Sequence, residues 1–207
     1  MTVLLALDVA TTTGFAYGEI GEKPLSNAID FRTLEIKALD KEIRQDDDKD
    51  RNTWVNDSIW KEGEAWLFQQ IKVIRPNIVA IEAPIRTASN GQTSPATLER
   101  LIGLQAIFRK VIHQMTPAHA IVISVQTVRK SFIGHGNLKG EVAKKLVRSR
   151  CLELGWITED VASLDRTDAL AVWGAVAATK GDIRGKWIGK GVYAPMPKAP
   201  ALDDMRF

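Results

Sequence analysis

The chain has 207 residues, of which 45% are hydrophobic, 26% are charged and only one, Cys151, is a cysteine. A chain of this length buries roughly 70% of its unfolded surface, so one domain with a sizeable core is expected. A single cysteine excludes an internal disulfide and a cysteine-based zinc site, and it predicts a reducing, cytoplasmic location. No apolar run approaches the ~18–20 residues that cross a bilayer, so no membrane partner is expected.

The formal net charge of +3 is unevenly distributed along the chain. Residues 126–190 carry 12 Lys and Arg against seven Asp and Glu, whereas residues 1–75 carry 10 against 14. A basic segment of this kind suits a surface that faces a polyanion such as nucleic acid. It is equally typical of solvated helix faces, so charge alone leaves both interpretations open.

The predicted elements alternate between strands and helices, as in an α/β protein. In chain order, we expect strands at 3–8, 15–20 and within 27–34, a helix from 54 to about 75, a strand at 78–82, a helix at 96–115, a strand at 120–125, and helices at 138–155 and from Ser163 to about 179. A short turn separates the first two strands, which are therefore expected to form an antiparallel hairpin.

Three further segments predict irregular structure. Residues 40–53, with an acidic run at 46–50, are expected to form an exposed, mobile loop that is solvated rather than a cation site. Residues 83–95 contain two prolines and a glycine and are expected to form a second loop. The chain becomes rich in glycine and then proline after residue 181, so we expect one domain over 1–180 and an extended tail over 181–207. The tryptophans of the 54–75 helix are assigned to the core.

Four acidic residues stand where a globular protein rarely leaves a charge unpaired. Asp8 and Glu82 each end a buried strand, and Asp165 and Asp168 share one face of the last helix. Four carboxylates placed together repel one another unless a cation compensates them, and hard oxygen ligands favour Mg²⁺ or Mn²⁺. Structural roles remain open: Asp8 could cap the threonine-rich turn, and the two late aspartates could interact with the positive end of their helix.

The order of these motifs resembles that of the RuvC-type Holliday junction resolvases, within the RNase H-like superfamily. The resemblance covers residues 3 to about 178 and rests on four segments, at 7–14 (Leu-Asp-Val-Ala-Thr-Thr-Thr-Gly), 81–83 (Ile-Glu-Ala), 128–137 (around Gly-His-Gly-Asn) and 165–171 (Asp-Arg-Thr-Asp-Ala-Leu-Ala). It implies an RNase H-like α/β fold with a mixed central sheet, an antiparallel hairpin at the N-terminus and helices on both faces. It also implies a homodimeric crossover junction endodeoxyribonuclease that serves DNA recombination and repair.

By this resemblance, the catalytic carboxylates Asp8, Glu82, Asp165 and Asp168 bind two Mg²⁺ ions, for which Mn²⁺ would substitute, and no nucleotide cofactor is expected. A catalytic lysine is expected after the Gly-x-Gly turn, where Lys139 is the nearest match although Gly140 stands at the usual position. The side chains expected to bind branched DNA are Arg86, Arg129, Lys130, Lys144, Lys145 and Arg148. Lys144 and Arg148 stand four residues apart and share a helix face. Lys130 and Lys139 could equally be ordinary surface lysines.

The loop after the second carboxylate departs from the family. Residues 85–87 are Ile-Arg-Thr, where the bacterial resolvases carry aromatic side chains that enter the junction centre. An aliphatic side chain can still wedge between base steps, although junction selectivity then need not be the same. With the acidic run and the tail, this departure indicates a phage-encoded or otherwise divergent member.

Other functions fit parts of the same pattern. The turn after Asp8 also resembles the phosphate-binding turn of the sugar kinase, actin and heat-shock ATPase group, but 207 residues contain no second turn of this type. An RNase H-like nuclease that acts on other branched DNA or on an RNA–DNA hybrid remains an alternative. A non-catalytic nucleic-acid-binding protein of this fold is a further alternative, against which the complete set of four acids argues. The leading prediction is a metal-dependent, structure-selective DNA endonuclease that resolves four-way junctions by two-metal phosphodiester hydrolysis.

Overall fold

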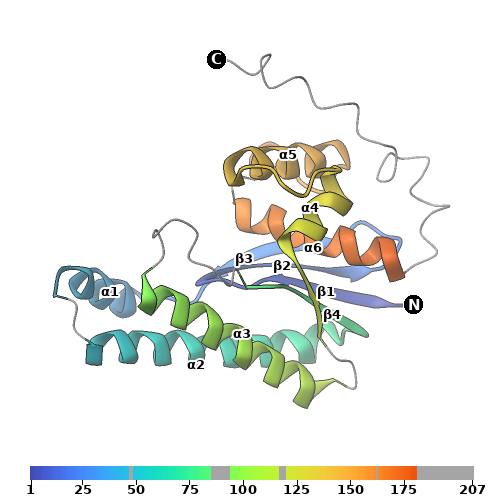
Figure 1. The fold of residues 1–207 in the computed structure, drawn as a ribbon. Coiled ribbons are helices and arrows are strands. Elements are labelled where there is room, and N and C mark those ends of the chain that lie inside the picture. Colours follow the sequence, from blue (N-terminus) through green and yellow to red (C-terminus); the bar gives the residue numbers. More distant parts are fainter. Residues whose placement is uncertain (47–48, 85–93, 117–119, 162, 181–207) are drawn as a thin grey trace.

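The computed structural model describes residues 1–46, 49–84, 94–116, 120–161 and 163–180, with side chains of 42–46 and 180 not described. Five strands form one mixed sheet in the order β3-β2-β1-β4-β5 (Figure 1). The strands are β1 (Val3–Asp8), β2 (Thr12–Glu19), β3 (Leu25–Asp30), β4 (Ile78–Glu82) and β5 (Ile121–Ile123). β1 pairs antiparallel with β2 and parallel with β4, which confirms the predicted N-terminal hairpin.

Helices cover both faces of this sheet (Figure 1). They are α1 (Leu34–Asp46), α2 (Lys49–Ile74), α3 (Pro95–Met115), α4 (Val125–Ile133), α5 (Gly140–Glu153) and α6 (Leu164–Lys180). α2 and α3 lie on one side of the sheet, and α4, α5 and α6 lie on the other. This arrangement confirms the predicted α/β architecture with a mixed central sheet. No helix among the described residues is long and apolar enough to cross a membrane.

The first strand shows why the apolar run at the N-terminus is nearly continuous. Successive side chains of a strand point to opposite faces of the sheet. Leu4 and Ala6 accordingly pack in the cluster beneath α4, α5 and α6, whereas Leu5 and Leu7 pack in the cluster beneath α2 and α3. All four side chains are fully buried, so β1 is the central strand of a two-sided core.

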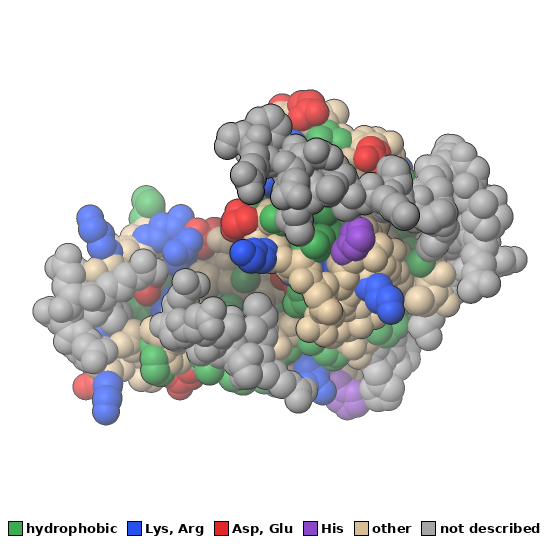
Figure 2. All heavy atoms as spheres, turned by 45° about the horizontal axis from the view of Figure 1, so that its top comes forward, with side chains coloured by type: hydrophobic (Ala, Val, Ile, Leu, Met, Phe, Trp, Pro, Cys, Tyr) green, Lys and Arg blue, Asp and Glu red, His purple; other side chains and the backbone are tan. Residues whose placement is uncertain are grey.

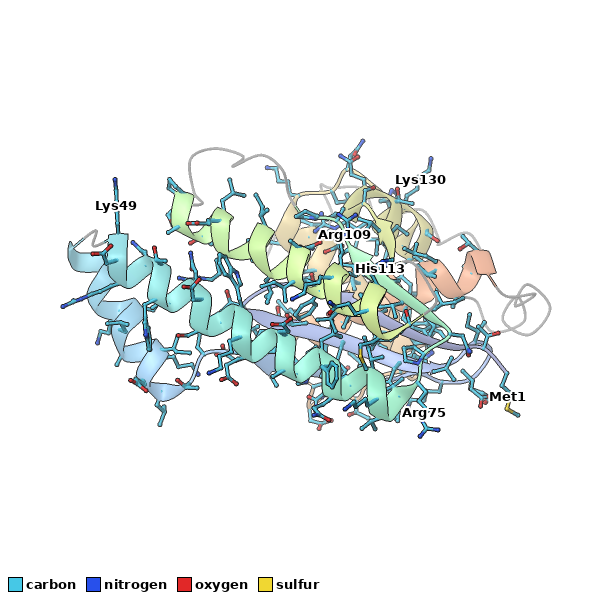
Figure 3. All side chains as sticks on the ribbon, turned by 90° about the horizontal axis from the view of Figure 1, so that it is seen from below. Met1, Lys49, Arg75, Arg109, His113 and Lys130 are labelled. Atoms are coloured by element: carbon cyan, nitrogen blue, oxygen red, sulfur yellow. The ribbon has the colours of Figure 1, made fainter. Side chains whose placement is uncertain are left out.

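α2 and α3 run side by side beneath the sheet, with Arg109 and His113 on α3 (Figure 3). A side chain at Gly103 on α3 would overlap the indole of Trp60 on α2, so the glycine permits the close contact. The indole Nε1 of Trp60 donates a hydrogen bond to the Arg100 carbonyl oxygen at 3.0 Å. Both contacts fix α3 on α2.

The prediction of an exposed loop over residues 40–53 is wrong, because the described residues there belong to α1 and α2. Asp40 is only 7% exposed. Its Oδ1 accepts from Nη2 of Arg100 at 3.1 Å, and Nε of Arg100 donates to Oδ1 of Asn56 at 2.8 Å. The partner of Asp40 is 60 residues away in the chain, so local composition carried no sign of this buried ion pair.

Three smaller predictions also differ from the structure. The strand predicted over 120–125 is shorter, because the Ser124 hydroxyl accepts from the Thr127 amide at 3.1 Å and caps α4, a helix that was not predicted. Trp54 is 44% exposed, so its assignment to the core is wrong. The fifth helix begins at Gly140 rather than at residue 138.

The loop residues 85–93, the run at 47–48 and the tail over 181–207 lie outside the described residues.

Candidate active site

Two of the predicted carboxylates lie side by side at one edge of the sheet. β1 and β4 are parallel, and their register pairs Leu7 with Ile81, so the next residues, Asp8 and Glu82, end neighbouring strands at the same edge. A side-chain hydrogen bond joins the two carboxyl groups. The strand order therefore assembles this pair from positions 74 residues apart in the sequence.

α6 brings the other two acids to the same place through a close contact with β2. Gly14 on β2 is the register partner of Asp8. A methyl group at Gly14 would overlap the backbone carbonyl of Asp165, so only glycine lets the first turn of α6 rest against this strand. Ser163 also caps this helix, since its Oγ accepts from the Arg166 amide at 3.4 Å. Asp165 and Asp168 consequently lie beside Asp8.

Asp8, Glu82, Asp165 and Asp168 are called the four-acid group below, and burial together with repulsion between neighbouring acids raises the pKa values of Asp8, Glu82 and Asp168. Burial first, and then the charges of Glu82, Asp168 and Asp165, raise the pKa of Asp8 well above its ordinary value. Burial is also the main cause that raises the pKa of Glu82 to about 7 and that of Asp168 to about 6. The charges of neighbouring acids therefore add to the effect of burial at Asp8, Glu82 and Asp168.

Two cations oppose this repulsion, and both come from the basic segment. Lys144 on α5 and Arg129 on α4 are half-buried, and their charges lower the pKa values of Asp168 and Glu82. Lys139, predicted as the catalytic lysine, is the exposed N-cap residue of α5. Of the candidate cations, Lys144 and Arg129 are thus the ones whose charge reaches the four-acid group in the described structure.

The remaining predicted DNA-binding residues are placed differently. Lys130 and Lys145 are exposed on α4 and α5. Arg148 is engaged within the fold, since its Nη2 donates to the Glu159 carbonyl oxygen at 2.8 Å. Arg86 lies outside the described residues.

Gln105 was missed by the sequence reasoning. It lies on α3, is 6% exposed, and its Nε2 donates to the backbone carbonyl oxygen of Glu82 at 2.7 Å. This bond fixes the end of β4, from which the Glu82 side chain projects. The only sequence signal was a glutamine on the apolar side of a predicted helix, and such a residue does not reveal its partner.

The donor chemistry of the four-acid group fits divalent cations. Its members offer only carboxylate oxygens, which are the ligands that Mg²⁺ and Mn²⁺ prefer, and three of them, Asp8, Glu82 and Asp168, have pKa values raised first by burial and then by neighbouring acids. Among the described residues, no three His, Cys, Asp or Glu side chains already stand close enough to hold one ion. The group is therefore a set of neighbouring hard ligands rather than a closed coordination shell.

No protein-family model and no curated protein sequence matches the chain. Solved structures do match it. The Thermus thermophilus RuvC structure superposes with a TM-score of 0.54 at 14% identity, over 92% of this chain and 98% of that one. The chain has the RuvC fold. T. thermophilus RuvC in complex with Holliday junction substrate matches with the same TM-score of 0.54 at 16% identity, over 90% of this chain and 98% of that one.

The likeness to RuvC confirms the predicted RNase H-like α/β fold. The yeast mitochondrial Holliday junction resolvase Ydc2 is a looser match, with a TM-score of 0.47 at 10% identity over 90% of this chain and 79% of that one, and it adds nothing to the fold assignment. At these identities the likeness establishes the fold alone.

Proposed function

We propose that the chain is a metal-dependent, structure-selective DNA endonuclease that resolves four-way junctions by phosphodiester hydrolysis. The observation that carries this proposal is the four-acid group, assembled from β1, β4 and α6 at one edge of a RuvC fold. The similarity to T. thermophilus RuvC in complex with Holliday junction substrate supports branched DNA as the substrate.

In this proposal Asp8, Glu82, Asp165 and Asp168 would hold two Mg²⁺ ions, or Mn²⁺ in their place. Bound divalent ions would supply Lewis acidity and a water of lowered pKa for attack on the phosphodiester. Asp8 and Glu82 end neighbouring parallel strands and interact through their carboxyl groups, so both are available to one site. Glycine at position 14 holds the α6 aspartates in reach of this pair.

Positive side chains would bind and orient the DNA backbone. Lys144 and Arg129 are the best placed to contact the phosphate that is cut, because their charges already act on Asp168 and Glu82. The exposed Lys130, Lys139 and Lys145 would contact phosphates farther from the cut, and such contacts position a duplex without reading its sequence. Symmetric cutting of two strands requires two sites, so we propose a homodimer.

The proposal is tested by incubating the full chain with four substrates: a four-way junction, a Y-branched DNA, an RNA–DNA hybrid and a linear duplex. We expect cleavage in Mg²⁺ or Mn²⁺, preference for the four-way junction, and no cleavage after chelation. Equal cutting of the linear duplex would contradict junction selectivity, and preference for the hybrid or the Y-branch would identify a different substrate for the same site. Binding without cleavage of any substrate would contradict the nuclease assignment.

A further inference from the structure

A second charged group lies at the same edge of the sheet, on the far side of β2. β3 and β1 both pair antiparallel with β2, so both run in the same direction and end at the same edge. Asp30 at the end of β3 pairs with Thr12, whereas Asp8 pairs with Gly14. Asp30 is thus two strands away from Asp8 and two residues farther along, which corresponds to about 12 Å at ordinary sheet spacings.

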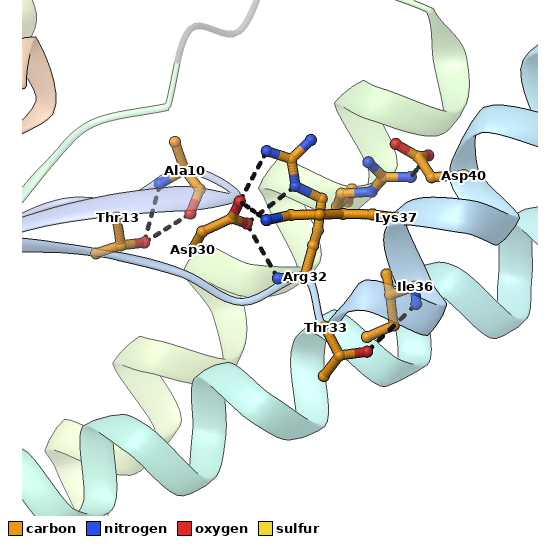
Figure 4. Close-up of polar contacts among 9 residues, drawn as sticks. Ala10, Thr13, Asp30, Arg32, Thr33, Ile36, Lys37 and Asp40 are labelled. Atoms are coloured by element: carbon orange, nitrogen blue, oxygen red, sulfur yellow. Dashed lines mark hydrogen bonds and ion pairs between the residues drawn. The ribbon is translucent and has the colours of Figure 1, made fainter.

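Asp30 holds two cations in a defined geometry (Figure 4). Nε and Nη2 of Arg32 donate to its two carboxylate oxygens at 2.9 and 3.0 Å, and Nζ of Lys37 lies 3.1 Å from Oδ2. The Arg32 backbone amide also donates to Asp30 Oδ1 at 3.0 Å. Two positive charges on one negative charge leave this Asp30 group, which comprises Asp30, Arg32 and Lys37, with a net charge of +1.

The two cations remain accessible to a ligand. The side chain of Lys37 is 46% exposed and that of Arg32 is 29% exposed. A guanidinium has five N–H donors and its bidentate pair with Asp30 uses two, while an ammonium group has three. Because Asp30 already orients both side chains, less conformational entropy is lost when they bind an anion.

We propose that Arg32 and Lys37 form a second phosphate-binding site, which holds a backbone phosphate of the nucleic acid on the β3 side of the four-acid group. This inference rests on the proposed function. The charges of Lys144 and Arg129 act on Glu82 at the end of β4, which lies on the opposite side of β1 from β3, so a DNA strand that crosses the four acids would meet positive charge on both sides. At a rise of ~3.4 Å per nucleotide, the separation of about 12 Å corresponds to roughly three to four nucleotides from the cut. Figure 2 shows Lys and Arg side chains on both halves of one face of the molecule.

The chain provides a matched control for the lysine of this site. Lys110 Nζ lies 3.0 Å from Glu64 Oε1 and its side chain is 57% exposed, which closely reproduces the ion pair of Lys37. Lys110 lines a pocket with Ala120, which immediately precedes β5. Lys110 therefore lies toward the end of the sheet where β5 begins, opposite to the end that carries the four-acid group. Loss of a surface ion pair has the same small effect on stability at both positions, but only Lys37 is placed to meet the DNA.

The experiment measures the salt dependence of DNA binding. The full chain carrying Asp168→Asn binds a labelled synthetic four-way junction without cutting it, and Arg32→Gln, Lys37→Gln and Lys110→Gln are each added to this background. For Arg32→Gln and for Lys37→Gln, we expect the slope of log K against log salt to decrease in magnitude by about 1. We expect Lys110→Gln to leave slope and affinity unchanged. We expect Lys37→Arg, which keeps the positive charge, to have the same slope as the Asp168→Asn parent. Thermal unfolding of each variant verifies that it is folded.

The possible outcomes separate this inference from the proposed function. If Lys37→Gln keeps the slope and affinity of Lys110→Gln while the junction is still bound, the phosphate site is wrong and the nuclease proposal stands. If no variant binds DNA, including the parent Asp168→Asn chain, the proposed function itself is wrong. A decrease of slope in Lys37→Gln with an unchanged melting temperature would support the site even if Arg32→Gln does not fold.

Discussion

The four-acid group and the Asp30 group lie at the same edge of the sheet but have opposite electrostatics. In the four-acid group, burial and repulsion raise the pKa of Asp168 to about 6 and that of Glu82 to about 7. In the Asp30 group, hydrogen bonds and charge from Arg32 and Lys37 lower the pKa of Asp30 to about 2, although partial burial opposes this. Asp8 and Asp30, which lie two strands apart, therefore have pKa values shifted in opposite directions because their neighbours differ. The first group needs a cation from outside, and the second already has two and presents positive charge.

The largest expected effect comes from removing a charge from the four-acid group. Asp168→Asn should lower the cleavage rate by about 10²–10³-fold, because several kcal/mol of transition-state stabilisation depend on the ions that these acids would hold. Junction binding should remain. Single-turnover cleavage and a binding titration measure both, with Asp57→Asn, an exposed acid on α2, as the control. Full activity of Asp168→Asn would show that Asp168 is not a ligand.

The same variant should be more stable than the wild type in metal-free buffer. A raised pKa means that the folded state favours the protonated acid, so stability is lost as pH rises from about 4 toward about 6. Asp168→Asn should therefore raise the melting temperature at pH 8 and leave it nearly unchanged at pH 4. Adding Mg²⁺ should stabilise the wild type more than the variant, and equal stabilisation of the two would contradict metal binding here.

The next effect concerns the cations that oppose the repulsion. Lys144→Gln should lower the cleavage rate by about tenfold, since one positive charge beside the reacting phosphate is lost. Lys145→Gln changes the adjacent, exposed residue and should have little effect on single-turnover cleavage. If the two variants lose activity equally, Lys144 contributes only to general DNA attraction.

A third prediction concerns the contact that brings α6 to the four-acid group. Gly14→Ala places a methyl group against the Asp165 carbonyl and should destabilise the fold by about 1–3 kcal/mol while lowering cleavage. Gly140→Ala has no heavy atom near its new methyl group and should be neutral or slightly stabilising. Urea unfolding and cleavage assays measure both variants. Wild-type stability of Gly14→Ala would disprove the close packing.

Removing the bond that fixes the end of β4 should have a smaller effect. Gln105→Ala leaves the buried carbonyl of Glu82 without its 2.7 Å hydrogen bond and should cost about 1–2 kcal/mol of unfolding free energy. Because Glu82 shifts with its backbone, cleavage should fall while junction binding holds. Gln114→Ala, an exposed glutamine on the same helix, is the control and should change neither property.

The smallest effect is expected in the Asp30 group. A pKa lowered to about 2 means that the ion pairs stabilise the fold fully above about pH 4, and that this stabilisation is lost as pH falls through about 2. Asp30→Asn should therefore cost up to about 1 kcal/mol at pH 7, because its partners are partly exposed. The difference from wild type should vanish near pH 2. Urea unfolding across pH tests this, and a loss that does not depend on pH would exclude the ion pairs as its cause.

Sequence and structure agree best where a pattern is local. The apolar run of β1, the acids that end β1 and β4, and the Asp-x-x-Asp spacing on α6 were all visible in the sequence, and the structure places these acids together. They disagree where a partner is distant. Residues 40–53 were expected to form a loop, but Arg100, 60 residues away, makes Asp40 a buried residue of a helix. The charge of Lys144 also reaches Asp168, a contact that its place in the sequence did not indicate, while the catalytic role of Lys139 stays a prediction.

The sequence by itself therefore determined the α/β class and the antiparallel hairpin, and it singled out the four acids as candidates, because strand burial and helical spacing are local properties of the chain. Only the tertiary structure decided which residues meet. The strand order places Asp8 beside Glu82, the missing side chain of Gly14 admits Asp165, and the direction of β3 brings Arg32 and Lys37 to the same edge. Electrostatic interactions weaken with distance and are screened over about 10 Å, so the chemistry of each acid depends on spatial neighbours that sequence distance does not reveal.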